Sequence, residues 1–337
     1  MTAKWEDEQI GLGQRASDEY SAEGAGRRGQ AKSAPRDGAS MRVTKAEAID
    51  LIQRFGLEGL PARVGDTVSS FERALTEVGP EARTYVLRAS GGQEAMNLPR
   101  LVNVDVAQMR EHLPRVLSAG AFILQPYEPL EHSVELALRH DGGMAAEVVP
   151  GRWELDLAIT PTRVTFHETR GGANPLAVRI LRPSTNAVEQ DVLRELEEWL
   201  KPRLDQLRGL VELAGTDICL KLHIYRKSRV SPQNFRSLSL WPFERRTTSV
   251  ANGAPLIRAV SDAVPDRTSA IVCDVRVRRE DAQQLKGLAE RLLLAGVREV
   301  WVRTGLLGHY ARMLREAGLE VALVPGLYSD DHQTERS

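Results

Sequence analysis

The stretch from Tyr85 to Val149 decides the fold, and it reads YVLRASGGQEAMNLPRLVNVDVAQMREHLPRVLSAGAFILQPYEPLEHSVELALRHDGGMAAEVV. An apolar strand-like run meets a loop with two glycines, and an amphipathic helix follows this loop. A second apolar run ends in a turn bracketed by Pro126 and Pro129, which opens onto a segment that alternates apolar and polar residues. The stretch therefore predicts strands joined by a helix, followed by an antiparallel hairpin.

The composition around this stretch is that of an ordinary globular protein. The 337 residues are 42% apolar and 27% charged, which suffices for two domains with a sizeable core. A net charge of −1 disfavours binding of nucleic acid or of an anionic membrane by the chain as a whole. Cys219 and Cys273 each lie in an apolar run, which suits reduced core thiols. With neither a membrane-length apolar run nor the apolar core of a signal peptide, we expect a cytoplasmic protein without a membrane partner.

The flanking segments predict further helices and strands. Thr44 and Glu47 have the spacing of a capping box, and apolar residues recur at helical spacing from there to Gly56. Residues 188–213 predict a long amphipathic helix with a break at Pro202. The C-terminal part alternates strands with helices, which predicts a small parallel sheet. We expect its strands at 270–275, 299–302 and 320–324 and its helices at 280–295 and 306–317.

Arg88 and the loop after it are candidates for binding phosphates. A site for ATP between two sheets needs a cation on a strand and small residues whose backbone amides approach the phosphates. Arg88 ends a strand, and Ser90, Gly91 and Gly92 follow it. A plain turn explains the same residues without a ligand.

The second apolar run of the deciding stretch is a candidate for binding the adenosine moiety. Gln125, Pro126 and Tyr127 come just after a buried strand, and the prolines fix an irregular backbone whose N–H and C=O groups are available to an adenine edge. Glu131 would then reach the ribose hydroxyls. The alternative is a loop that carries surface carboxylates.

A second hairpin, over residues 217–236, carries oxygen ligands of the kind that Mg²⁺ prefers. Asp217 opens one strand, and Asn234 stands near the end of the next. Antiparallel pairing can bring two such positions together. A lone Asp and Asn in a hairpin are usually structural, which is the alternative interpretation.

With these three motifs in this order along the chain, the segment of residues 44–236 resembles the ATP-grasp superfamily. The segment from Tyr85 to Arg88 is similar to the strand that carries the family's phosphate-binding lysine, and residues 90–92 resemble its mobile glycine-rich loop. Residues 122–134 resemble the adenine hinge and the ribose-binding stretch. Asp217, with the later Asn234-x-Arg236, resembles the two-strand metal site.

The resemblance implies a chain of the α+β / α/β class. The expected fold is an ATP-grasp-like cradle of two subdomains with antiparallel sheets, plus a small C-terminal parallel α/β domain. We expect a disordered tail over residues 1–40, the nucleotide-binding domain over 41–240, a linker over 241–256, the small domain over 257–328 and a frayed end over 329–337.

The resemblance also implies an ATP- and Mg²⁺-dependent ligase. Such an enzyme activates a small-molecule or peptide carboxylate as an acyl phosphate, which an amine or similar nucleophile then attacks. In this interpretation Arg88 and Arg236 act in catalysis, and Asp217 and Asn234 hold the metal. The nucleotide is held by Arg88, Ser90, Gly91, Gly92, Gln125, Pro126, Tyr127 and Glu131.

The sequence departs from the family pattern at two of these positions, and the second departure favours an alternative without catalysis. Arg88 stands where the family has lysine, and Pro232 stands where it has a metal-bridging glutamate. A degenerate protein that binds a nucleotide or a partner protein fits these residues, and a scaffold protein with an accidental resemblance is a third hypothesis. The segment 302–309 passes from a strand into a helix, where either an anion site or an ordinary N-cap by Thr304 is expected.

Overall fold

The computed structural model confirms the predicted fold class, with two antiparallel sheets and one small parallel sheet. It describes residues 43–57, 59–79, 81–91, 98–152, 159–168, 176–182, 188–225, 229–238, 254–265, 268–275, 277 and 282–324. The predicted tail and frayed end lie outside these residues, as does most of the predicted linker, so the domain boundaries stay predictions.

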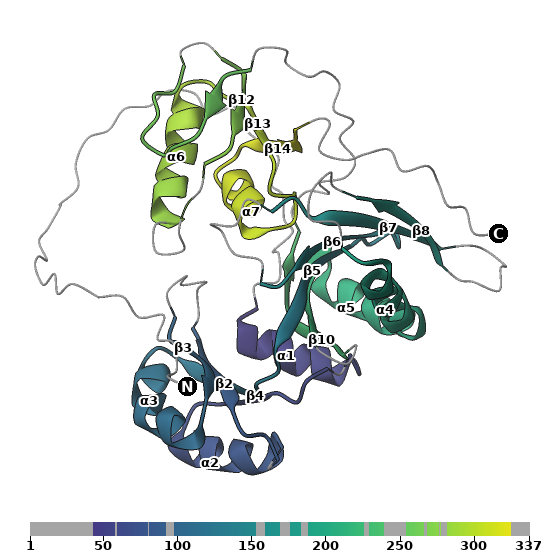
Figure 1. Cartoon of the computed structure of the whole chain (residues 1–337), viewed down its shortest axis with the longest axis vertical. Helices are drawn as coiled ribbons and strands as arrows, with labels where there is room; N and C mark the ends of the chain where they lie inside the picture. Colours follow the sequence, from purple (N-terminus) through teal and green to yellow (C-terminus); the bar gives the residue numbers. More distant parts are fainter. Residues whose placement is uncertain are drawn as a thin grey trace, which may run out of the picture. The chain divides into compact units, whose positions relative to one another are not determined.

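Sheet A is a four-stranded antiparallel sheet in the order β1-β4-β2-β3 (Figure 1). Helices α2 and α3 cover one face of it, and Phe71 of α2 packs edge-to-face on Phe122 of β4 with ring centroids 5.6 Å apart. Its elements are β1 (Arg63–Gly65), α2 (Val68–Glu77), β2 (Tyr85–Ser90), β3 (Arg100–Val104), α3 (Val106–Ser118) and β4 (Ala121–Pro126).

Sheet B is a six-stranded antiparallel sheet in the order β10-β9-β5-β6-β7-β8. Apolar side chains on one of its faces form the largest core cluster together with helices α1, α4 and α5. The strands are β5 (Leu130–Leu138), β6 (Met144–Pro150), β7 (Thr162–Glu168), β8 (Leu176–Leu181), β9 (Ile218–Tyr225) and β10 (Arg229–Ser237). The helices are α1 (Lys45–Arg54), α4 (Gln190–Leu200), the 3-10 turn η1 (Lys201–Arg203) and α5 (Leu204–Ala214).

Sheet C is the predicted parallel sheet, with its four strands in sequence order. Helices α6 and α7 pack against its strands in a separate apolar core. The elements are β11 (Leu256–Ile257), β12 (Ala270–Cys273), α6 (Ala282–Leu294), β13 (Glu299–Val302), α7 (His309–Glu316) and β14 (Glu320–Leu323).

Local signals in the sequence set most of the helix ends. The capping box at the start of α1 is confirmed, because the Thr44 side chain accepts from the Glu47 N–H and the Glu47 carboxylate accepts from the Thr44 N–H. The expected break at Pro202 is η1, which separates α4 from α5.

Three predictions of elements were wrong or incomplete. Strands β8 and β11 were not predicted. Helix α7 begins at His309 instead of Leu306, and its N-cap is Gly308, so the predicted N-cap at Thr304 is wrong. None of the helices in the described part combines the length and apolar character needed to cross a lipid bilayer.

Candidate functional site

The face of sheet B away from its helices carries a line of charged and polar side chains, which we call the polar face. On β9, Lys221 and His223 alternate with core residues, and on β5 and β6 so do Glu135 and Glu147. Strand pairing places Glu135 directly between Glu147 on one side and Lys221 on the other. Charged side chains are rarely buried unless they are paired or take part in a function, so this face is the candidate site.

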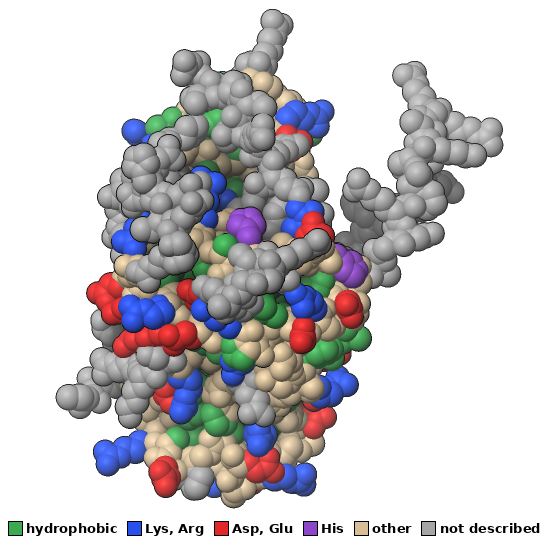
Figure 2. All heavy atoms as spheres, turned by 90° about the vertical axis from the view of Figure 1, so that its right-hand side faces the viewer, with side chains coloured by type: hydrophobic (Ala, Val, Ile, Leu, Met, Phe, Trp, Pro, Cys, Tyr) green, Lys and Arg blue, Asp and Glu red, His purple; other side chains and the backbone are tan. Residues whose placement is uncertain are grey.

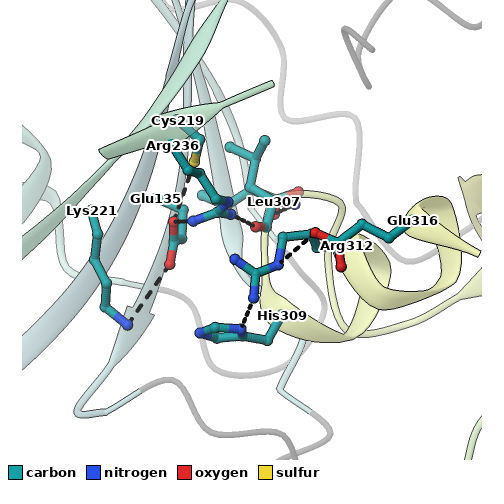
Figure 3. Close-up of polar contacts among 9 residues, drawn as sticks. Glu135, Cys219, Lys221, Arg236, Leu307, His309, Arg312 and Glu316 are labelled. Atoms are coloured by element: carbon teal, nitrogen blue, oxygen red, sulfur yellow. Dashed lines mark hydrogen bonds and ion pairs between the residues drawn. The ribbon is translucent and has the colours of Figure 1, made fainter. Parts of the chain in front are cut away.

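Glu135 is buried, with 2% of its surface exposed, and it is held by two cations. Its carboxylate accepts from Arg236 Nη1 at 3.0 Å, lies 3.8 Å from Lys221 Nζ and accepts from the Cys219 thiol at 3.2 Å (Figure 3). Burial raises the pKa of Glu135, but Arg236 and Lys221 outweigh it, so the pKa lies below its usual value. Glu135 is therefore an anion that offsets the two cations beside it.

Glu147 binds backbone amides of the C-terminal α/β unit. Its carboxylate accepts from the Leu306 N–H at 2.8 Å and from the Leu307 N–H at 2.7 Å, and Arg163 lies 3.7 Å away. Burial raises the pKa of Glu147, although these partners oppose the shift. The segment 302–309, for which the sequence left open an anion site or an N-cap, binds the chain's own Glu147 carboxylate through amides that precede α7.

Two arginines of sheet A form a pair of like charges. Arg88 on β2 stands directly opposite Arg100 on β3, on the face away from α2 and α3. The Arg88 Nε and Nη2 atoms are buried and have no hydrogen-bond partner. Like charges directly opposite each other destabilise an antiparallel pair, and an unsatisfied buried donor adds a further cost. An anionic ligand would offset the repulsion between the two arginines and would accept hydrogen bonds from the unsatisfied Arg88 donors.

The two arginines act electrostatically on the polar face of sheet B. Burial keeps the pKa of His223 well below its usual value, and the nearby cations Lys221, Arg88, Arg100 and Arg152 lower it further. Burial raises the pKa of Tyr225 to about 12, although Arg88 and Arg100 oppose the shift. The His223 Nδ1 and the Tyr225 hydroxyl are 3.1 Å apart. These groups form a cationic site around a neutral imidazole and a neutral phenol.

On the face drawn in Figure 2, Lys and Arg side chains lie among Asp and Glu side chains, as expected from the small net charge. The cationic site is therefore a local feature of the fold, which the overall charge did not indicate.

The predicted phosphate-binding loop is only partly described. Ser90 is buried at the end of β2, and its hydroxyl accepts from the Ala46 N–H at 3.0 Å, so it satisfies a backbone donor in the first turn of α1. Gly91 follows Ser90, while Gly92 lies outside the described residues.

The predicted adenine hinge lies at the end of β4, whose last two residues are Gln125 and Pro126. Gln125 is buried opposite Val86, and Pro126 ends the strand. The Tyr127 N–H donates to the Thr84 carbonyl oxygen at 2.9 Å, so this hinge donor is engaged within the protein. The Glu131 side chain is exposed at the start of β5.

The structure does not place Asp217 and Asn234 opposite each other. Asn234 pairs with Lys221, whereas Asp217 precedes β9 and its carboxylate accepts from the His140 N–H at 2.9 Å. Four strand positions separate them on β9, or about 13 Å along the strand. The other predicted residue of this hairpin, Arg236, binds Glu135 and donates to the Leu307 carbonyl oxygen at 2.6 Å.

The donor set around Asn234 does not fit a divalent cation. The nearest charged groups on the polar face are cations, beginning with Lys221. Among the described residues, no group of three or more His, Cys, Asp and Glu side chains is arranged to hold a metal ion. The observed chemistry suits an anion better than Mg²⁺.

Sequence reasoning missed several residues of this site, namely Arg100, Glu135, Glu147, Arg152, Lys221 and His223. A signal for three of them exists in the sequence. Glu135, Glu147 and Lys221 each stand between two apolar residues of a strand, and a charge inside a buried strand is expected only where it has a partner or a function.

Comparison with known proteins finds similar solved structures only. No protein-family model and no curated protein matches the sequence. The solved structures that are similar include the ADP complex of PurK, an N5-carboxyaminoimidazole ribonucleotide synthetase, at 13% identity and a TM-score of 0.37 over 58% of this chain and 45% of that one.

Two further similar structures are ligases as well. The ATP-grasp ligase PsnB, complexed with a minimal precursor, matches at 15% identity and a TM-score of 0.32 over 59% of this chain and 53% of PsnB. The D-alanine-D-alanine ligase from Coxiella burnetii matches at 8% identity and a TM-score of 0.35 over 57% of this chain and 47% of the ligase. The chain thus spans about half the length of the solved ligases that it resembles in fold.

Proposed function

We propose that this protein is an ATP-grasp-like nucleotide-binding protein that holds the phosphates of ATP or ADP mainly with arginine and lysine side chains. The proposal rests on the cross-strand pair of Arg88 and Arg100, with the buried, partnerless nitrogens of Arg88. A polyphosphate supplies several acceptor oxygens and a compensating charge to such a pair. The phosphates would lie between these two arginines of sheet A and Lys221 of sheet B.

The neutral groups of the site are also compatible with nucleotide binding. His223 stays uncharged because burial and the nearby cations lower its pKa, so its imidazole adds hydrogen bonding without adding charge. The hinge of Gln125, Pro126 and Tyr127 would contact the adenine, and Glu131 the ribose, as the sequence resemblance implies.

Mg²⁺ has no part in this proposal, because Asp217 and Asn234 are not arranged as a metal-binding pair. The family's acyl-phosphate chemistry depends on metal ions that neutralise the phosphates. The arrangement of Asp217 and Asn234 is what supports proposing the alternative without catalysis in place of the carboxylate ligase that the sequence resemblance implies.

A nucleotide titration tests the proposal. We expect ADP and ATP to raise the melting temperature of the full chain in the presence of EDTA, since the cations of the protein replace the metal. Arg88→Gln is expected to weaken the nucleotide affinity by about tenfold or more, because it removes a charge-assisted contact. Arg110→Gln is the matched control, since Arg110 is an exposed arginine paired with Glu72.

Two outcomes would contradict the proposal. The first is an unchanged melting temperature at millimolar nucleotide. The second is stabilisation that requires Mg²⁺ and is followed by release of ADP from ATP, which would support the carboxylate ligase instead.

A further inference from the structure

The two carboxylate oxygens of Glu135 have different surroundings, and this difference decides how tightly Glu135 holds Lys221. The Oε2 atom accepts from Arg236 Nη1 at 3.0 Å and from the Cys219 thiol at 3.2 Å. The Oε1 atom lies 3.8 Å from Lys221 Nζ, which is too long for a hydrogen bond. Figure 3 shows Lys221 at one oxygen of Glu135 and the other two donors at the second oxygen. The carboxylate is thus directed toward donors other than Lys221.

Arg236 is fixed at both of its terminal nitrogens. While Nη1 donates to Glu135, Nη2 donates to the Leu307 carbonyl oxygen at 2.6 Å. Leu307 is itself held on sheet B, because its N–H donates to Glu147 and its side chain belongs to an apolar cluster with Cys219. A guanidinium binds two acceptors in a fixed geometry. The C-terminal unit therefore helps to determine where Arg236 meets Glu135.

Cys219 adds a hydrogen bond without adding a charge. Strand pairing places it directly opposite Arg236, so both side chains reach the same oxygen of Glu135. Burial raises the pKa of the Cys219 thiol, which keeps the sulfur protonated and able to donate. Cys219 also stands two residues before Lys221 on β9, on the same face of the sheet.

We propose that Arg236 and Cys219 are positioning residues, which hold Glu135 so that Lys221 stays available to the nucleotide phosphates. The proposal deepens the proposed function and rests on it for the contact between Lys221 and the phosphates. In this role, neither positioning residue touches the nucleotide. Without Arg236, the buried carboxylate would turn toward Lys221, because a buried charge that loses its partner is costly. The Lys221 ammonium would then be held in a closer ion pair and would be less available to phosphate.

Calorimetric titration of the full chain with ADP in EDTA tests the proposal. We expect Arg236→Gln to weaken the ADP affinity by about tenfold. Adding Glu135→Gln to this variant should restore the affinity to within about threefold of the native value, because a neutral amide does not hold Lys221. Arg236→Lys is expected to bind ADP as the native protein does, since it keeps a cation beside Glu135.

Two further variants separate positioning from a general effect of charge. Cys219→Ala changes no charge and is expected to weaken the ADP affinity by about threefold, because it removes one hydrogen bond to Glu135. Arg163→Gln is the matched control, since it removes a cation of the same sheet that lies 3.7 Å from Glu147. We expect Arg163→Gln to bind ADP as the native protein does. If Arg236→Gln does not fold, Cys219→Ala and its reversal by Glu135→Gln take its place.

Three results with ADP would overturn the proposal. The first is native affinity in Arg236→Gln. The second is a loss that Glu135→Gln does not reverse, because Arg236 would then contact the nucleotide itself. The third is an equal loss in Arg163→Gln, because the total charge of the face would then explain the effect.

Unfolding in urea tests the same arrangement without a nucleotide. Lys221→Met is expected to lower the urea midpoint more in the Arg236→Gln protein than in the native protein, because the buried Glu135 is then without either cation. Equal shifts in the two proteins would overturn the proposal. A larger shift in the Arg236→Gln protein, together with no binding of ADP by the native protein, would refute the proposed function alone.

Discussion

Arg88 is a residue whose environment is unfavourable for the folded protein on its own. Its Nε and Nη2 atoms are buried without partners, and Arg100 stands directly across the strand pair. Each buried donor without a partner costs about 1–3 kcal/mol. Groups that destabilise a fold in this way are concentrated at functional sites, where a ligand supplies the missing partner.

Replacing Arg88 by methionine is therefore expected to stabilise the free protein and to weaken nucleotide binding. We expect the free energy of unfolding in urea to rise by about 1–2 kcal/mol, since methionine keeps the apolar stem and removes the unsatisfied donors. Arg110→Met, at an exposed position, is the control and should stay within about 0.5 kcal/mol of the native protein. A less stable Arg88→Met protein would show that Arg88 has a structural role in sheet A.

In the loop before α7, a contact with a residue distant in the sequence overrides the local signal for a helix start. Thr304 is a typical N-cap residue and a helix was expected from residue 306, yet α7 begins at His309. The Leu306 and Leu307 N–H groups donate instead to Glu147, which is 159 residues away from Leu306 in the sequence. A single glycine, Gly305, permits this geometry.

Gly305→Ala is expected to weaken the attachment of this loop to sheet B. The new Cβ atom would meet Pro161 Cγ at 2.7 Å, and the φ of +88° is unfavourable for alanine. We expect a loss of about 1–3 kcal/mol in the free energy of unfolding, because the substitution disturbs the contact between this loop and Glu147. Gly287→Ala in α6 is the control, because its Cβ atom would meet no heavy atom within 4 Å. Equal effects of the two substitutions would contradict the close approach at Gly305.

Sequence reasoning predicted the elements that depend on local patterns. The deciding stretch has the expected strands and helix, and the capping box of Thr44 lies where predicted. Sequence reasoning did not predict that Asp217 and Asn234 lie four strand positions apart, because strand register depends on pairing along the whole hairpin. An irregularity between Pro232 and Asn234 shifts that register, and β10 is an edge strand, where a proline is tolerated.

For the whole molecule, the missed residues share one cause. Arg100 belongs to sheet A, Lys221 and His223 belong to sheet B, and Glu147 of sheet B binds amides of the C-terminal unit. The electrostatic effect of these residues on one another arises only in the folded protein, where the sheets and the C-terminal unit are assembled. In its own segment of the sequence, each is an ordinary polar residue. Local patterns therefore predicted the fold class better than the site.

The assembled site also predicts how stability depends on pH. His223 has a folded-state pKa well below 6.5 because it is buried and faces Lys221, Arg88, Arg100 and Arg152. Below pH 6.5 the unfolded chain binds a proton at this imidazole while the folded protein does not. The free energy of unfolding therefore falls as the pH falls, by up to about 1.4 kcal/mol per pH unit until the folded-state pKa is reached.

The difference between native protein and His223→Gln isolates this effect, because other groups titrate in the same range. Glu147 acts in the opposite direction, since burial raises its pKa and the folded protein gains a proton there first as the pH falls. We expect urea unfolding between pH 7 and pH 5 to show a smaller loss of stability for His223→Gln than for the native protein. His167→Gln, on the exposed side of β7, controls for removal of a surface imidazole. Parallel stability curves for the native protein and His223→Gln would mean that the cations do not act on His223, and the cationic site itself would then be in doubt.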